Sequence, residues 1–228
     1  MADQPTPAVQ DYLKVIHQLG GAAEGVASGK IAAALGVKAP SVIGMLKRLA
    51  DAGWIEYSAF AGTGAKLSAA GLAEALRVIR RHRLVELFLT QVLKLDWSEV
   101  DAEAEALEHA ISPRLEQALA DYLGEPHEDP HGHPIPSRTG ELKTRNLKRL
   151  SEFRAGDTVV VREVQDDNPD RLRHWRTQGL TPGARVRVLV YQELDDLFEV
   201  EVDGRLIRLG SEGLNGIRGE PVISADAK

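Results

Sequence analysis

The chain has 228 residues, no cysteine and a formal net charge of −6 at neutral pH. Its length exceeds that of one typical domain, so we expect two or three domains. The lack of cysteine excludes disulfides and thiolate–zinc sites, so a metal site must use His and carboxylate ligands, which favour harder cations. The N-terminal segment has no basic start followed by an apolar run, and no apolar stretch approaches the roughly 18 residues of a membrane helix. We therefore expect a cytoplasmic protein without a membrane-spanning segment.

Positive charge is concentrated in one part of this acidic chain. Between residues 30 and 83, nine Lys and Arg residues stand against three acidic residues, which gives about +6 there and about −12 in the remainder. Such an asymmetry indicates that one region binds nucleic acid while the others have different tasks.

The N-terminal third predicts a run of short helices. Apolar residues at helical spacing predict an amphipathic helix at residues 7–19, with Asp11 on the flank of its apolar stripe. After a Gly-Gly break, a short helix is expected at residues 28–35. Pro40 suits the first position of a third helix, which extends to about residue 51.

Two strands, at residues 54–57 and near residue 66, are predicted next, with a glycine-containing loop at residues 61–65 between them. This element order is that of a winged helix-turn-helix, with the third helix as the recognition helix. Candidate DNA-contacting residues lie at the start and outer face of that helix and at the wing: Lys38, Ala39, Pro40, Ser41, Gly44, Lys47, Arg48 and Lys66. The cations suit phosphates, and the helix start suits base edges. The alternative is an ordinary helical hairpin with solvated cations.

Two later helical segments each carry potential metal ligands on one face. His82 and Glu86 are four residues apart, and Glu105, Glu108 and His109 occupy positions i, i+3 and i+4. A carboxylate beside an imidazole on an apolar helix is costly to bury unless a cation balances the charge. The alternative is that the acidic residues form a solvated helix face and that the histidines are merely hydrogen-bonded.

The remaining elements predict a fold that is mainly α with a C-terminal β-barrel. A long helix at residues 68–93 and two helices between residues 97 and 123 form a helical layer suited to dimerisation. Strand patterns follow at residues 158–164, 186–190, 198–202 and 206–209, with an Asp203-Gly204 hairpin signal and a helix at residues 169–179. These elements predict a winged helix-turn-helix domain at residues 1–75, a helical domain with linker at 76–150, and an SH3-like domain at 151–228.

The chain resembles the DtxR/MntR family of metal-activated transcriptional repressors over nearly its whole length. The stretches that carry the resemblance are QDYLKVI, APSVIGMLKRLADAGWI, RRHRLVE, EALEH, GHPIP and LRHWRTQGLTPGARVRVL. The resemblance implies a homodimer, without enzymatic activity, that binds a palindromic operator in double-stranded DNA. It also implies that a divalent metal locks the first helix against the dimerisation core and so sets the spacing of two recognition helices.

The resemblance also implies two metal sites. Its primary site falls on Asp11, His82, Glu105, Glu108 and His109, and its ancillary site falls on Glu86, Asp129 and His131, with Asp166 and Asp167 as acidic candidates from the last domain and His127 and His133 as further histidines. Carboxylates stand at positions 11 and 105, where the iron branch has sulfur ligands. This difference implies Mn(II) as the activator, with Fe(II) as the alternative and Zn, Co or Cd as substitutes in vitro. Lys14 stands where regulators with two adjacent manganese ions have Glu, which disfavours a second adjacent ion.

Two competing functions follow from the same residues. An enzyme with a carboxylate-bridged metal centre needs Glu-x-x-His on two helices, a pattern that this sequence lacks. A metal-independent winged-helix regulator that responds to an organic ligand would make the His and carboxylate clusters incidental.

The resemblance also bears on DNA recognition. At Gly44 the iron branch of the family carries an amide side chain, so base recognition there is expected to be weaker and DNA shape more important.

Overall fold

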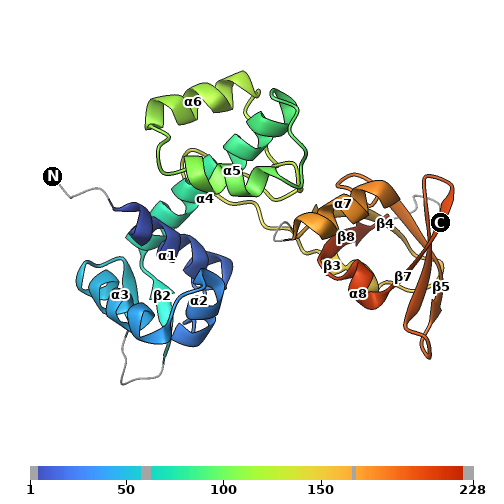
Figure 1. Cartoon of the computed structure of the whole chain (residues 1–228), viewed down its shortest axis with the longest axis horizontal. Helices are drawn as coiled ribbons and strands as arrows, with labels where there is room; N and C mark the ends of the chain where they lie inside the picture. Colours follow the sequence, from blue (N-terminus) through green and yellow to red (C-terminus); the bar gives the residue numbers. More distant parts are fainter. Residues whose placement is uncertain (1–4, 58–62, 166–167, 223–228) are drawn as a thin grey trace, which may run out of the picture. The chain divides into compact units, whose positions relative to one another are not determined.

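The computed structural model describes residues 5–57, 63–165 and 168–222 (Figure 1). The chain separates into two compact units. Unit 1 comprises Met1–Arg81, Glu108–Ala110 and Pro136–Leu142, and unit 2 comprises His82–Leu107, Ile111–Ile135 and Lys143–Lys228. The predicted division into three domains at residues 75 and 150 stays a prediction.

Unit 1 contains the predicted winged helix-turn-helix. Its elements in chain order are α1 (Pro7–Gln18), α2 (Ser28–Leu35), α3 (Ala39–Asp51), β1 (Ile55–Tyr57), β2 (Ala65–Leu67) and the first part of α4 (Ala69–Gln91). β1 and β2 pair antiparallel. The predicted helix and strand order is therefore confirmed, while the first part of the predicted wing loop, residues 61–62, lies outside the described residues.

Local sequence explains where these helices begin and end. The Thr6 hydroxyl accepts a hydrogen bond from the Val9 N–H at the start of α1, and Gly36 ends α2 in the left-handed region at a φ of +64°. The apolar faces meet in one core, in which Leu13, Ile16 and Leu46 are fully buried. Burial of each such side chain stabilises the unit by about 1.5–3 kcal/mol. Among the described residues, no single helix has the length and apolar content of a membrane span; α2 and α3 do so only together, and they meet at 111°.

Unit 2 begins with a helical layer. It contains the second part of α4, α5 (Val100–Leu107) and α6 (Pro113–Tyr122), whose first turn is capped by the Ser112 hydroxyl. Val85 and Leu89 of α4 pack with Val100 and with Ile111, which lies just before α6. The two helices predicted between residues 97 and 123 are therefore confirmed, and the second begins after Ser112.

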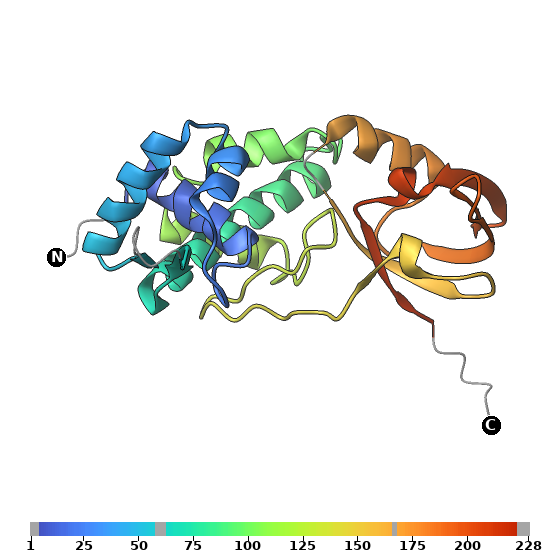
Figure 2. The ribbon, with the colours of Figure 1, turned by 90° about the horizontal axis from the view of Figure 1, so that it is seen from below.

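A six-stranded antiparallel sheet forms the C-terminal part of unit 2 (Figure 2). Its strands in spatial order are β3 (Lys148–Arg149), β8 (Ile217–Pro221), β4 (Thr158–Val164), β5 (Arg185–Gln192), β6 (Leu197–Val202) and β7 (Arg205–Gly210), and a 3-10 turn (Leu150–Glu152), α7 (Pro169–Gln178) and α8 (Ser211–Leu214) complete this part. Asp203 and Gly204 both have positive φ, as the predicted hairpin requires. The predicted strands and α7 are confirmed, and closure of the sheet into a barrel stays a prediction. β8 was missed because its short sequence, IRGEP, contains Gly and Pro.

The linker and the segment before α5 lie against this sheet within unit 2. Trp97 belongs to the same apolar core as the strands, and Asp96 forms a 2.7 Å ion pair with Arg176 of α7. The Val164 N–H of β4 donates to the His131 carbonyl at 3.0 Å. These contacts place the DPHGH loop, residues 129–133, beside the end of β4.

Two glycines provide a matched test of the packing in unit 1. A Cβ at Gly71 would lie 2.0 Å from the Trp54 carbonyl oxygen, whereas a Cβ at Gly44 would meet no described atom within 4 Å. We therefore expect Gly71→Ala to lower the free energy of unfolding by about 2 kcal/mol or more. Gly44→Ala should raise it by about 0.5–1 kcal/mol, because alanine is the better helix former. Urea unfolding of the full chain measures both, and equal effects would contradict this packing.

Candidate metal centre and DNA-binding face

Three potential ligands meet in unit 1, and we call Asp11, Glu108 and His109 the α1 cluster. Asp11 projects from the flank of α1, and Glu108 and His109 directly follow α5. His109 Nε2 lies 2.8 Å from Asp11 Oδ1 and 3.6 Å from Glu108 Oε1. One ligand atom from each residue lies within 4.8 Å of the other two, which is a spacing that one metal ion could bridge.

The His109 ring is held by a chain of hydrogen bonds. The Gln10 side-chain amide donates to Glu74 Oε1 at 2.6 Å, so the Gln10 Oε1 atom is the acceptor that faces His109 Nδ1 at 2.7 Å. His109 therefore donates through Nδ1 and turns Nε2 towards the two carboxylates. A hydrogen bond of this kind on the second ring nitrogen is typical of metal-ligating histidines.

Lys14 adds a cation to the same neighbourhood. Its Nζ donates to both Glu108 carboxylate oxygens at 2.8 Å, and both side chains are buried. Position 14 of α1, where regulators with two adjacent ions have an acidic ligand, therefore carries a cation that pairs with Glu108.

A second group of ligand atoms, which we call the α4 cluster, lies in unit 2 and comprises His82, Glu86 and Asp101. His82 Nε2 lies 3.3 Å from Asp101 Oδ1 and 3.6 Å from Glu86 Oε1. Glu105 is also close, with its Oε2 atom 3.8 Å from His82 Nδ1. Sequence reasoning missed Asp101, although its spacing of four residues before Glu105 places both on one face of α5.

Glu86 is completely buried and its charge is poorly satisfied. Neither of its carboxylate oxygens has a hydrogen-bond partner in the described part of the chain. The nearest cationic or ring nitrogens are His131 Nδ1 at 3.5 Å and His82 Nε2 at 3.6 Å, beyond good hydrogen-bond distance. Burial acts to raise the pKa of Glu86, but the facing imidazoles of His131 and His82 outweigh it and hold that pKa below its ordinary value.

His131 is fixed by Trp97. Its Nε2 lies 2.8 Å from the Trp97 carbonyl oxygen, and the two rings stack with centroids 5.4 Å apart. Since a carbonyl can only accept, Nε2 carries the proton and Nδ1 faces Glu86. His131 Nδ1 and Glu86 Oε1 thus lie 3.5 Å apart, so a ring nitrogen and a buried carboxylate oxygen, both possible metal ligands, face each other.

Asp129 organises the DPHGH loop. Its Oδ1 accepts the backbone N–H groups of His131 and His133 at 2.8 and 3.0 Å, and its Oδ2 lies 3.4 Å from Arg83 Nε. Burial acts to raise the pKa of Asp129, but the His133 imidazole and the Arg83 guanidinium outweigh it and lower that pKa to about 2. Ligand atoms of Asp129, His131 and His133 lie within 4.8 Å of one another.

Both donor sets consist of carboxylate oxygens and imidazole nitrogens, which suit a hard divalent cation. In the α4 cluster the buried Glu86 carboxylate has no hydrogen bond within the described residues, whereas in the α1 cluster Glu108 is paired with Lys14. The structure brings Asp11, Glu108 and His109 together in unit 1, and His82 and Glu105 in unit 2. That all five residues bind one metal ion as a single primary site stays a prediction. Of the predicted ancillary ligands, His131 approaches Glu86, whereas Asp166 and Asp167 lie outside the described residues.

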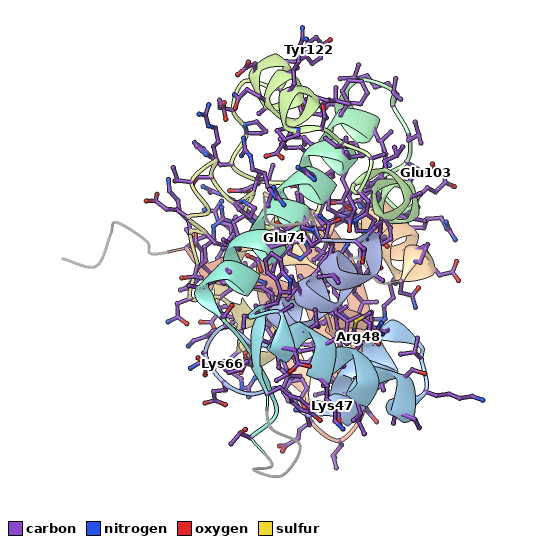
Figure 3. The ribbon with its side chains drawn as sticks, turned by 90° about the vertical axis from the view of Figure 1, so that its left-hand side faces the viewer. Lys47, Arg48, Lys66, Glu74, Glu103 and Tyr122 are labelled. Carbon is purple, nitrogen blue, oxygen red and sulfur yellow. The ribbon has the colours of Figure 1, made fainter. Side chains whose placement is uncertain are left out.

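The predicted DNA-contacting residues form an exposed face of unit 1. Val42, Leu46 and Leu49 of α3 are buried, and the residues on the opposite side of this helix are exposed. Figure 3 shows Lys47 and Arg48 on α3 and Lys66 on β2. All eight candidates are exposed: Lys38, Ala39, Pro40, Ser41, Gly44, Lys47, Arg48 and Lys66. Their contacts with bases and phosphates stay predictions.

Comparison with protein families covers all three parts of the chain. Residues 5–63 match the family described as "Iron dependent repressor, N-terminal DNA binding domain". Residues 68–137 match "Iron dependent repressor, metal binding and dimerisation domain", and residues 148–221 match the FeoA domain.

Curated relatives and solved structures agree with these matches. The iron-dependent repressor IdeR of Mycobacterium tuberculosis (strain H37Rv) is 34% identical over 192 residues, which cover 78% of this chain and 81% of the relative. A solved manganese-dependent transcriptional repressor in complex with manganese is 36% identical, with a TM-score of 0.86 over 94% of this chain and 100% of the other. The structure of the manganese regulator SloR has a TM-score of 0.74 at 29% identity, over 96% and 100% of the two chains.

The extent of these similarities shows the family directly. The matched families and relatives are repressors and not enzymes, so they rule out the carboxylate-bridged metalloenzyme that was considered as a competing function. The chain belongs to the DtxR/MntR family of metal-dependent transcriptional repressors.

Proposed function

We propose that this repressor is activated by Mn(II) and controls genes of metal uptake and homeostasis as a cytoplasmic homodimer on a palindromic operator. The observation that carries the proposal is the α1 cluster, in which Asp11, Glu108 and His109 offer only oxygen and nitrogen ligands. Such ligands suit Mn(II), although divalent-metal affinity alone would favour later metals, so geometry and metal supply also contribute to selectivity.

The residues around the α1 cluster suit a switch. Asp11 lies on α1, which packs in the same core as α3, so an interaction at Asp11 acts on the DNA-binding unit itself. A bound divalent cation would supply positive charge to the carboxylates. Gln10 holds the His109 ring in the orientation that directs Nε2 towards that charge. Moving such an equilibrium from mostly inactive to mostly active requires about 5 kcal/mol of differential binding, which chelation of one or two ions can supply.

Fe(II) is the alternative activator. It is favoured by the similarity to IdeR, which is an iron-dependent repressor. Against it stand the carboxylates at Asp11 and Glu105 and the similarity to manganese-dependent repressors. Softer ligands would be expected in an iron-selective site of this family.

DNA binding in defined metal tests the proposal. Fluorescence anisotropy with DNA from upstream of the organism's own manganese-uptake genes, at near-physiological salt, is measured in chelator and after addition of Mn(II), Fe(II) or Zn(II). We expect binding to appear only with metal and most strongly with Mn(II). Equal binding in chelator and metal would contradict a metal switch, and a preference for Fe(II) would support the alternative.

Ligand variants test the clusters with a control on the same helix. The double substitution Glu105→Ala and Glu108→Ala should abolish the response to Mn(II), because it removes two carboxylates from the predicted primary site. Glu103 is exposed on α5, and Figure 3 marks its position. Glu103→Ala should therefore retain the wild-type response. A double variant that still responds to Mn(II) would show that Glu105 and Glu108 do not form the sensing site, whereas a wild-type chain that binds DNA equally in chelator and in metal would support the metal-independent regulator.

The ancillary site is proposed around Glu86, with His82, Asp101 and His131 as its partners. The buried, poorly satisfied carboxylate and the fixed His131 ring support it. Asp129 was predicted as a further ligand, but its Oδ1 accepts two loop N–H groups, and its Oδ2, which has no hydrogen bond within the described residues, lies 3.4 Å from the Arg83 guanidinium. We therefore propose a mainly structural role for Asp129.

The pH dependence of stability tests that role. The pKa of Asp129 is about 2 in the fold against 3.8 ordinarily, so its charge stabilises the fold fully above about pH 4. This contribution, roughly 2 kcal/mol, is lost as the pH falls towards 2. In chelator, Asp129→Asn should lower the free energy of unfolding by roughly that amount at pH 7, with a smaller deficit at pH 3. A deficit independent of pH would contradict the role, and a weaker Mn(II) affinity would instead make Asp129 a ligand.

The salt dependence of DNA binding tests the exposed face of α3. Lys47→Ala and Arg48→Ala should each weaken binding to specific and unrelated DNA alike. Each should also reduce the slope of log affinity against log salt concentration by about one, because each removes a phosphate contact. Arg138 is an exposed cation outside the helix-turn-helix, so Arg138→Ala serves as the control. Unchanged slopes in the α3 variants would remove this face from the interface.

A further inference from the structure

The proposed function assigns no task to the ion pair between Lys14 and Glu108. The Lys14 side chain is 7% exposed and that of Glu108 is 0% exposed, and the ammonium contacts both carboxylate oxygens at 2.8 Å. Charged side chains are rarely buried so completely unless they are paired, since removal from water penalises each charge. Lys14 thus balances a carboxylate that the fold has already buried.

One of the two oxygen atoms held by Lys14 also faces another ligand of the α1 cluster. Glu108 Oε1 accepts from Lys14 Nζ and also lies 3.6 Å from His109 Nε2. A divalent cation bound among Glu108, His109 and Asp11 would therefore share this oxygen with the ammonium or take it over. At such short distances two cations repel each other strongly in a buried environment. The Lys14 charge consequently opposes the charge that the α1 cluster is suited to bind.

The placement of Lys14 makes an exchange feasible without unfolding. Asp11 and Lys14 are three residues apart on α1, so one helix presents both a ligand and a competing cation. The ammonium is carried by a flexible four-carbon chain. It can withdraw from Glu108 while the backbone of α1 remains helical.

We infer that Lys14 is a tethered counter-cation that competes with the divalent metal for Glu108 and thereby sets the metal concentration at which the repressor responds. This inference rests on the proposed function and adds a residue that tunes affinity. When metal is scarce, Lys14 keeps the buried Glu108 carboxylate paired. When metal is abundant, the ion displaces the ammonium from Glu108. Because this displacement costs free energy, the repressor responds at a higher metal concentration than it would without the Lys14 charge.

Direct metal titration tests the competition. Free Mn(II) is followed by electron paramagnetic resonance during titration of the full chain, in a Glu86→Gln background that suppresses the α4 cluster. Lys14→Met and Lys14→Gln remove the charge, and Lys14→Arg keeps it. We expect the two neutral variants to bind Mn(II) at least about tenfold more tightly than the parent, and the Arg variant to stay within about threefold.

A second measurement separates competition from a purely structural role. Thermal unfolding is compared in chelator and in saturating Mn(II). Competition predicts that the neutral Lys14 variants are less stable in chelator and gain more from Mn(II) than the parent does. Equal losses in both conditions, with an unchanged or weaker Mn(II) affinity, would overturn the inference. Competition by charge would also be refuted if Lys14→Arg tightened binding as much as Lys14→Met.

The controls distinguish this inference from the proposed function. If Lys14→Met does not fold, Lys14→Gln, which keeps a hydrogen-bond donor near Glu108, gives the result. A wild-type chain that binds no Mn(II) would refute the proposed function. A wild-type chain that binds Mn(II) and responds on DNA, with Lys14 variants of equal affinity, would refute only the competition.

Discussion

Compensation of the buried Glu108 carboxylate is the constraint around which the α1 cluster is built. The fold removes this charge from water completely, so a positive partner must be supplied. In the structure Lys14 supplies it, and His109 and Asp11 stand ready beside the same oxygen. A buried carboxylate that either an ammonium or a bound divalent ion could balance would be a simple physical basis for a sensor.

The same principle recurs in the α4 cluster with a different outcome. Glu86 is as deeply buried as Glu108, but its neighbours are imidazoles at 3.5–3.6 Å rather than an ammonium in hydrogen-bond contact. Its pKa is nevertheless held low, so the carboxylate remains charged. Because His131 is fixed by Trp97, whose ring packs in the core of the C-terminal sheet, the charge at Glu86 is connected to that sheet within unit 2.

The DNA-binding unit and the α1 cluster share one structural element. Tyr12, Leu13 and Ile16 of α1 belong to the core that also positions α3, and Asp11 of the same helix faces His109. A change in how α1 is held therefore acts on the packing that supports the recognition helix. This arrangement is consistent with a family whose DNA affinity depends on metal.

The sequence by itself determined the elements whose signals are local. Helical spacing predicted α1 and α3, and the Asp203-Gly204 turn predicted a hairpin. The expected single helix face of Glu105, Glu108 and His109 was wrong, because α5 ends at Leu107 and the last two residues follow it. The resemblance to a known family was also readable from short stretches of sequence. These features depend on neighbours within about four residues, where helix and turn geometry fix the outcome.

Only the tertiary structure decided which charges meet across elements. The Lys14–Glu108 pair joins residues 94 positions apart. The approach of His131 to Glu86 depends on a loop that Asp129 holds in place. Asp101 meets His82 because α5 packs against α4. Strand β8 was not predicted from the sequence either, because its extended conformation is stabilised by hydrogen bonding to β4 and its short sequence carries no strand pattern. Burial and long-range pairing arise from packing of whole faces, and no local spacing encodes them.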